Sequence, residues 1–286
     1  INKALLIDKN NEVALHKLGL TLFKENEVDL AIKNLKYLIK KSTNTTIFKY
    51  DLANIFLIKE QYKDSEKLYL DIIKVKPEFS ECYCNLGVIY QKIGKLDKAK
   101  KFFSEAVNLE PDNNHFINNL SLILIDQENF QEAQENLEWS LSLDEKNYKT
   151  SNLLAKVHFL TNNYKVCDEY IEKSLLLAPD DVETLILAGS ILFSRNLLKE
   201  SNDIYLKALK LSPDNLTILS NLGHLSTITN SIDLAFKYLN RAIEIDPEHN
   251  FSKNILAGIY KTNNDYTMAR ELYLESKEPN WEENVL

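Results

Sequence analysis

The residue types that catalyse reactions or hold metal ions occur in this sequence of 286 residues, but their spacing does not bring them together. The five histidines are His16, His115, His158, His224 and His249. No two of them have the i, i+4 spacing of a helical metal site. The sequence contains no Gly-x-x-x-x-Gly-Lys, Gly-x-Gly-x-x-Gly or Gly-x-Ser-x-Gly motif. We therefore expect no catalytic residue, no cofactor and no small-molecule substrate in this segment.

The three cysteines do not form a metal or disulfide framework. Cys82 and Cys84 are separated by one residue, whereas zinc and redox sites use Cys-x-x-Cys, and Cys167 lies far away. Reduced thiols are typical of cytosolic proteins. We therefore predict no metal site, a core position for Cys167, a more reactive Cys84 on a groove surface, and a cytoplasmic location.

The charge balance excludes other partners. The chain has 34 basic and 42 acidic residues, a formal charge of −8, and no arginine besides Arg195, Arg241 and Arg270. Phosphate binding needs a basic surface, so nucleic acid is not expected as a partner.

No apolar run approaches the roughly 18 residues that span a bilayer, and residues 1–8 lack the pattern of a signal peptide.

The spacing of prolines and glycines indicates an internal repeat. Pro77, Pro111, Pro179, Pro213 and Pro247 are separated by 34 or 68 residues, and Gly19, Gly87, Gly189 and Gly223 by multiples of 34. Residues that interrupt regular backbone structure do not recur in this way by chance. The period divides the chain into eight units without insertion: 12–45, 46–79, 80–113, 114–147, 148–181, 182–215, 216–249 and 250–283.

The third unit carries a recognisable pattern: Tyr83, Leu86, Gly87, Tyr90, Ala99, Phe103, Ala106 and Pro111. This pattern resembles the tetratricopeptide repeat, and the resemblance covers residues 12–283. It implies an all-α fold, a right-handed superhelical solenoid in which each unit is a helix–turn–helix.

Residues at equivalent positions support this fold independently. Position eight of every unit is small (Gly19, Ala53, Gly87, Ser121, Ala155, Gly189, Gly223 and Ala257), and position twenty-four is large (Leu35, Tyr69, Phe103, Leu137, Ile171, Tyr205, Leu239 and Tyr273). Large side chains packed on small ones let two helices interlock without voids. Position fifteen is mostly asparagine, with one glycine, which suits a left-handed turn between the helices.

The two ends of the chain depart from the eight units. Residues 1–11 are in phase with the closing helix of a preceding, truncated unit, and residues 284–286 form a tail. The chain begins with Ile1 rather than methionine. We therefore expect it to be part of a longer protein.

The resemblance also implies where a ligand binds. In tetratricopeptide arrays the first helix of each unit lines a concave groove through positions two, five, six, nine, twelve and thirteen. Amide side chains there both donate and accept, so a ladder of them can hold the backbone of an extended peptide. The candidate peptide-binding residues at these positions are Tyr50, Asn54, Asn85, His115, Asn118, Asn119, Asn152, Asn221 and His224.

Two explanations of this asparagine pattern remain open. Lys17, Leu153, Leu187 and Ile255 interrupt the ladder at position six, and asparagine is abundant throughout the chain, so composition alone is the alternative to groove function. The carboxylate clamp that grips chaperone C-termini is not expected. Asn54 and Asn85 match two of its positions, but Tyr50, His115 and Asn119 stand where it has cations. Apolar groove positions offer anchors for apolar side chains instead: Phe23, Leu57, Phe159, Phe193 and Phe251.

The sequence therefore predicts a scaffold that binds a partner protein or peptide in its groove and is not itself an enzyme. The alternative is a substrate-recognition domain of a larger glycosyltransferase or sulfotransferase whose catalytic domain lies outside this chain. Fold alone does not separate the two, because such arrays serve many functions.

Overall fold

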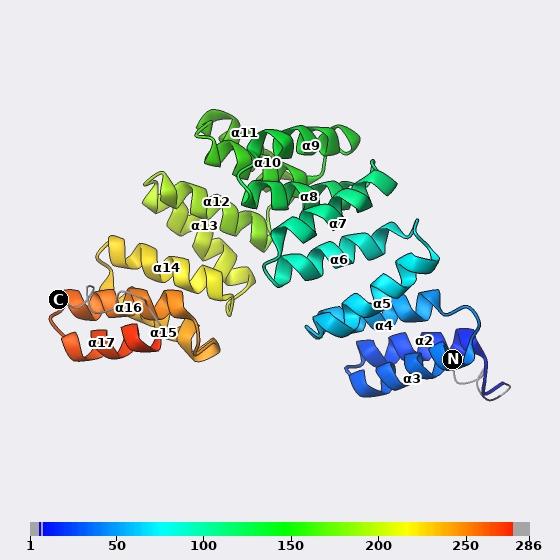
Figure 1. Cartoon of the computed structure of the whole chain (residues 1–286). Helices are drawn as coiled ribbons and strands as arrows, with labels where there is room; N and C mark the ends of the chain where they lie inside the picture. The colour runs from blue at the N-terminus through cyan, green and yellow to red at the C-terminus, as the bar shows by residue number, and fades with distance from the viewer. Residues whose placement is uncertain (1–5, 7, 277–286) are drawn as a thin grey trace. The chain divides into compact units, whose positions relative to one another are not determined.

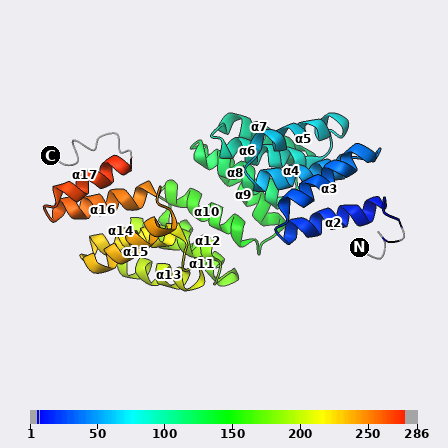
Figure 2. The same ribbon diagram turned by 90° about the horizontal axis from the view of Figure 1, so that it is seen from below.

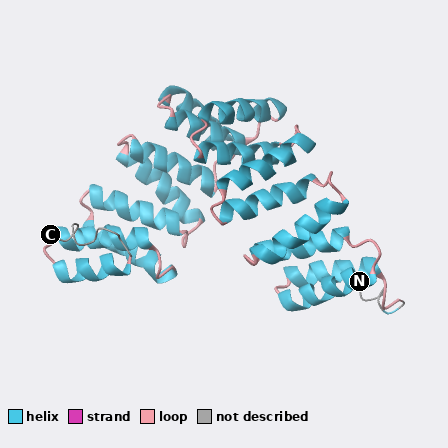
Figure 3. Cartoon of the chain, in the orientation of Figure 1, coloured by secondary structure: helices cyan, strands magenta, loops and turns pink. Residues whose placement is uncertain are grey.

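The computed structural model describes residue 6 and residues 8–276, and from residue 12 onward these form helix pairs (Figure 1). The first helices of the pairs are α2 (Glu12–Lys24), α4 (Thr46–Ile58), α6 (Ser80–Lys92), α8 (Asn114–Asp126), α10 (Tyr148–Leu160), α12 (Val182–Ser194), α14 (Leu216–Ile228) and α16 (Asn250–Thr262). The second helices are α3 (Val28–Lys41), α5 (Tyr62–Val75), α7 (Leu96–Leu109), α9 (Phe130–Leu143), α11 (Tyr164–Leu177), α13 (Leu198–Leu211), α15 (Ile232–Ile245) and α17 (Tyr266–Glu275). Within this described part no strand occurs (Figure 3), so the predicted all-α fold is confirmed.

Side chains just before several first helices cap them, and a left-handed residue separates the two helices of each repeat. Asn147, Asp181 and Asn215 accept a backbone N–H of the first turn of the following helix through their side chains, which satisfies a donor that the helix itself leaves open. The turn residue at position fifteen has a left-handed backbone in every unit, with φ between 57° and 72°: Asn26, Glu60, Gly94, Glu128, Asn162, Asn196, Asn230 and Asn264. The predicted turn conformation is thus confirmed, including at the two glutamates.

Each helix pair interlocks through the predicted large-on-small contact. Phe103 of α7 is fully buried against Gly87 of α6, where an added Cβ would lie 2.6 Å from the ring. Tyr205 packs on Gly189 with the same spacing. Cys167 at position twenty is fully buried, which confirms its predicted core position. The apolar core therefore lies between the two helices of a repeat and beneath the next first helix.

The chain divides into two compact units, residues 1–145 and 146–286, and each is described by itself. In the first unit each second helix packs against the first helix of the next repeat, as α3 does on α4 and α7 on α8. The second unit has the same order, and Figure 2 shows α14 and α15 beside α16 and α17. First helices also touch one another within a unit, as in α6 with α8 and α14 with α16.

Parts of the predicted organisation lie outside the described residues. These are most of the truncated unit assigned to residues 1–11, residues 277–283 of the eighth repeat and the tail at 284–286. Among the helices that are described, none combines the length and the apolar character needed to cross a membrane.

Candidate functional site

The candidate site is the first-helix face, which we define as positions two, five, six, nine, twelve and thirteen of the first helices. All eight first helices have the same length and recur every 34 residues, so equivalent positions lie on equivalent sides of each helix. Since first helices touch their neighbours within a unit, side chains at these positions meet between repeats.

A hydroxyl from the second helix organises the asparagines of the first unit. Tyr69 of α5 is fully buried, and its hydroxyl donates to Oδ1 of Asn54 at 2.5 Å. Asn85, on the next first helix, donates through Nδ2 to Asn54 Oδ1 and to the Tyr69 hydroxyl, both at 3.1 Å. Burial raises the pKa of Tyr69, so the phenol stays protonated. The three side chains therefore form one hydrogen-bonded group, which we call the tyrosine-anchored rung.

The same rung recurs four repeats later in the second unit. Ser190 donates to the carbonyl of Ile186, so its Oγ is left to accept from the Tyr205 hydroxyl at 2.9 Å. Asn221 Nδ2 donates to the Tyr205 hydroxyl at 3.2 Å. Burial raises the pKa of Tyr205 as well. Asn221 thus shares the tyrosine anchor of Asn85, whereas the serine at position nine replaces Asn54 and bonds to Tyr205.

Asn119 is held differently, because position twenty-four of the preceding repeat is Phe103 and has no hydroxyl. Its Nδ2 lies 3.3 Å from Sγ of Cys84 and 3.3 Å from Nε2 of His115. Cys84 is only 2% exposed, and burial raises the pKa of its thiol to about 11. The prediction of an accessible, reactive Cys84 is therefore wrong, since Asn119 and the neighbouring helices cover the sulfur.

A further link between repeats joins position five to position six of the following first helix. Nε2 of His16 lies 2.5 Å from Oδ2 of Asp51, and both side chains are mostly buried. The Cys84–Asn119 contact has the same 35-residue separation. Position six is therefore the place where successive first helices of the first unit are tied together.

The other sequence candidates have mixed surroundings. The ring of Tyr50 lies 6.0 Å from that of Tyr69 and 5.0 Å from that of Phe79, and burial raises its pKa. Asn118 accepts from Ser140 of its own second helix at 3.3 Å, so this contact turns toward the repeat interior. Asn152 donates to Oγ1 of Thr184 on the next first helix at 2.8 Å.

His224 belongs to an aromatic cluster in the second unit. Its ring lies 5.1 Å from that of Phe193 on α12 and 5.9 Å from that of Phe251 on α16. Burial lowers the pKa of His224 below its ordinary value of 6.5, so the imidazole is mainly neutral near pH 7. Phe251 is 46% exposed. The structure thus brings His224 together with two of the apolar groove positions.

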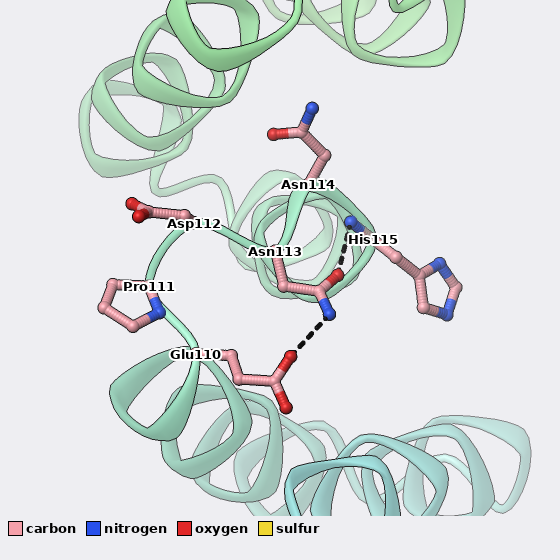
Figure 4. Close-up of a pocket in the computed structure, with 6 residues that line it drawn as sticks. All are labelled: Glu110, Pro111, Asp112, Asn113, Asn114 and His115. Carbon is pink, nitrogen blue, oxygen red and sulfur yellow. Dashed lines mark hydrogen bonds between the residues drawn. The ribbon is translucent and has the colours of Figure 1, made fainter.

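His115 also borders a hollow at the turn between α7 and α8 (Figure 4). Asn113 accepts from the backbone N–H of His115 at 3.1 Å and donates to Oε2 of Glu110 at 2.9 Å. Hydrogen bonds from Ser80 and Asn113 lower the pKa of Glu110. These bonds cap a helix and close a turn, so we assign this hollow a structural role.

Sequence reasoning missed the tyrosines of the two rungs. Tyr69 and Tyr205 lie on second helices, and the sequence pattern identified them only as the large core residues at position twenty-four. Their rings are indeed buried. A signal was nevertheless present: tyrosine at position twenty-four, asparagine or serine at position nine, and asparagine at position six of the next repeat. No group of three or more histidine, cysteine, aspartate or glutamate side chains suited to a metal ion occurs in the described portion of the chain.

Comparisons with known proteins agree with this architecture. Two sequence models of the tetratricopeptide repeat match the chain, one at residues 80–113 and the other at residues 115–147 and 216–249. Anaphase-promoting complex subunit 3 of Dictyostelium discoideum is 31% identical over 98 residues, which are 34% of this chain and 10% of that protein. The match therefore spans about a tenth of the length of this curated relative.

Solved structures share the fold at low sequence identity. A tetratricopeptide repeat protein from Parabacteroides merdae has a TM-score of 0.75 at 14% identity, covering 86% of this chain and 97% of that one. A chain of the APC/C hetero-tetramer Cut9–Hcn1 has a TM-score of 0.69 at 15% identity, covering 91% of this chain and 52% of that one.

Proposed function

Because the chain is built from tetratricopeptide repeats, a scaffold typical of protein–protein interaction, we propose that its first-helix face binds an extended segment of a partner polypeptide. In this role the chain binds and positions its partner and carries out no chemical step. The face offers oriented amides at Asn85 and Asn221, which suit recognition of a peptide backbone.

The tyrosine-anchored rung is the observation that carries the proposal. Both Nδ2 protons of Asn85 are directed at Asn54 and Tyr69, so Oδ1 is left to accept a hydrogen bond from a ligand. The rung holds this oxygen in place before a ligand arrives, which reduces the entropy lost on binding. An amide side chain can in general make two hydrogen bonds to a peptide backbone, one as donor and one as acceptor. With Nδ2 engaged inside the protein, one bond per rung is the better expectation.

The named relatives support a place in an assembly of several proteins. Anaphase-promoting complex subunit 3 and the chain of the Cut9–Hcn1 hetero-tetramer are, by their names, components of multi-protein complexes. We propose the same general role for this chain, as a scaffold that holds partner polypeptides.

We also propose that the protein functions in a reducing compartment such as the cytoplasm. Cys82, Cys84 and Cys167 are all buried free thiols, and proteins of oxidising compartments usually pair their cysteines.

The test uses a phage-displayed library of random decapeptides selected on the whole chain, followed by calorimetric titration of the best synthetic peptide. The Asn85→Ala, Asn119→Ala double variant loses two Oδ1 acceptors and thus two hydrogen bonds to the peptide, each contributing about 0.5–1.5 kcal/mol net. We therefore expect affinity to fall about 5- to 150-fold. The matched control, Asn108→Ala with Asn240→Ala, removes two exposed asparagines from second helices and should leave affinity unchanged.

Melting temperatures separate binding from folding. Asn85→Ala leaves the Tyr69 hydroxyl bonded to Asn54, so the double variant should melt within a few degrees of wild type. Full affinity in a folded double variant would contradict the proposal. A large drop in melting temperature would show that the two asparagines serve the fold.

A further inference from the structure

Three rings on successive first helices form one apolar strip in the second unit. Phe193 occupies position twelve of α12, His224 position nine of α14 and Phe251 position two of α16, so the strip crosses the three helices diagonally. The centroid distances of 5.1 and 5.9 Å place the rings in direct contact. Nearly half of Phe251 is exposed although it belongs to this cluster.

A fixed polar atom lies beside the strip. Asn221 precedes His224 by three residues on α14, so the two side chains leave the same side of the helix. Asn221 donates a hydrogen bond from Nδ2 to the Tyr205 hydroxyl, and this bond orients Oδ1 of Asn221. An apolar surface and an oriented acceptor therefore lie within one helical turn.

The charges around the strip have one predominant sign. Lys149 and Lys156 of α10 occupy positions two and nine, which are those of Phe251 and His224 in their own repeats. Lys261 of α16 occupies position twelve, which is that of Phe193. The three lysines therefore lie on the first-helix face. Helix α14 carries no aspartate, glutamate, lysine or arginine, and Glu183 is the acidic residue at the face positions of α10, α12, α14 and α16. The chain as a whole has a formal charge of −8. This face is therefore more basic than the rest of the protein.

We propose that Phe193, His224, Phe251 and Asn221 form a second peptide site, for an extended segment with one aromatic side chain flanked by acidic residues. The proposal rests on the first-helix face being a binding surface, but its residues are separate from Asn85 and Asn119. It assigns a ligand chemistry to the second unit that Asn85 and Asn119 of the first unit do not specify.

Each part of the ligand meets a complementary group. The aromatic side chain packs edge-to-face or offset on the rings of Phe251 and His224, and a neutral imidazole costs less to remove from water than an imidazolium. A backbone N–H of the ligand donates to Asn221 Oδ1. Acidic residues on either side approach Lys149 and Lys156 at one end and Lys261 at the other, which increases the association rate at low salt.

The experiment measures fluorescence anisotropy of a fluorescein-labelled decapeptide with one phenylalanine between two pairs of glutamates, titrated with the whole chain. We expect saturable binding that weakens about two- to tenfold when alanine replaces the peptide's phenylalanine. Phe251→Ala in the protein should weaken binding by a similar factor. Leu176→Ala is the matched control, because Leu176 is a strongly exposed apolar residue on a second helix, and it should have no effect.

Further measurements separate this site from the proposed function. Peptides in which lysines replace the glutamates should bind about threefold more weakly or worse. The Asn85→Ala, Asn119→Ala variant should bind the glutamate peptide as wild type does. Absence of saturable binding, equal binding of the lysine peptide, or loss of binding in that double variant would each overturn the second site. The test of the first unit stays separate when its peptide is selected in the presence of excess glutamate peptide, which occupies the second site.

Discussion

Replacing Gly87 by alanine tests the packing that sets the distance between the two helices of the third repeat. A Cβ at this position would lie 2.6 Å from both Cδ1 and Cε1 of Phe103, a fully buried ring. Gly258, in the interior of α16, provides a matched control, since the nearest atom to its added Cβ is the Tyr273 hydroxyl at 4.0 Å.

The two substitutions share one energy term and differ in the other. Alanine in a helix interior is more favourable than glycine by about 0.8–1.0 kcal/mol, and both sites gain this. Overpacking a core costs about 1–3 kcal/mol, and only Gly87→Ala incurs it. We therefore expect Gly258→Ala to stabilise by up to about 1 kcal/mol and Gly87→Ala to destabilise by up to about 2 kcal/mol. Because the propensity gain cancels, the difference between the variants measures the overpacking.

Urea unfolding followed by circular dichroism gives the two free energies of unfolding, and hydrogen exchange locates the change. In a repeat array stability is nearly a sum of repeat and neighbour terms, so protection should fall around α6–α8 and stay unchanged in α14 and α15. Equal stabilisation by both substitutions would refute the packing argument. Uniform loss of protection along the chain would refute its local character.

The remaining predictions concern the turns and the thiols. Gly94 has φ of 72° and no atom within 4 Å of an added Cβ, so Gly94→Ala should destabilise by about 1–2 kcal/mol through backbone strain alone. Glu128 has φ of 59°, so Glu128→Gly should change stability in the opposite sense. Urea midpoints that move the other way would contradict this. Burial raises the pKa of Cys82 to about 12 and the pKa values of Cys84 and Cys167 to about 11. All three thiols should therefore react slowly with a disulfide reagent at pH 8 in the folded protein and rapidly in guanidinium. Rapid labelling of any one of them in the folded protein would refute its burial. Because these raised pKa values favour the protonated thiols in the folded state, their contribution to stability should be lost as the pH rises above 9.

The repeat architecture could be predicted because its causes are local and periodic. Gly19 and Gly223 recur where two helices approach closely, and Asn162 and Asn230 recur where the backbone must be left-handed. Each such residue type suits one backbone or packing requirement, so its position in the sequence reveals the requirement. The first helices recur every 34 residues with one length, as do the second helices before α17, which ends at Glu275.

The candidate site was predicted only in part. Its position on the first helices followed from the resemblance, and Asn85 and Asn119 do lie between successive first helices. The hydrogen-bonding partners of these asparagines could not be predicted in the same way. The side chain at position six bonds to whichever groups the neighbouring first and second helices place beside it. Tyr69 supplies a hydroxyl beneath Asn85, whereas Phe103 supplies none beneath Asn119.

The sequence by itself thus determined the period, the left-handed turns and the interlocking pairs, since each depends on residue types that recur at fixed positions of the 34-residue unit. Only the tertiary structure decided that Cys84 is covered, that Asn85 and Asn221 are anchored by tyrosine hydroxyls, and that His224 joins Phe193 and Phe251. These contacts join residues 15 to 35 positions apart on different helices. Their existence depends on side-chain reach and burial between repeats, which a periodic pattern does not encode.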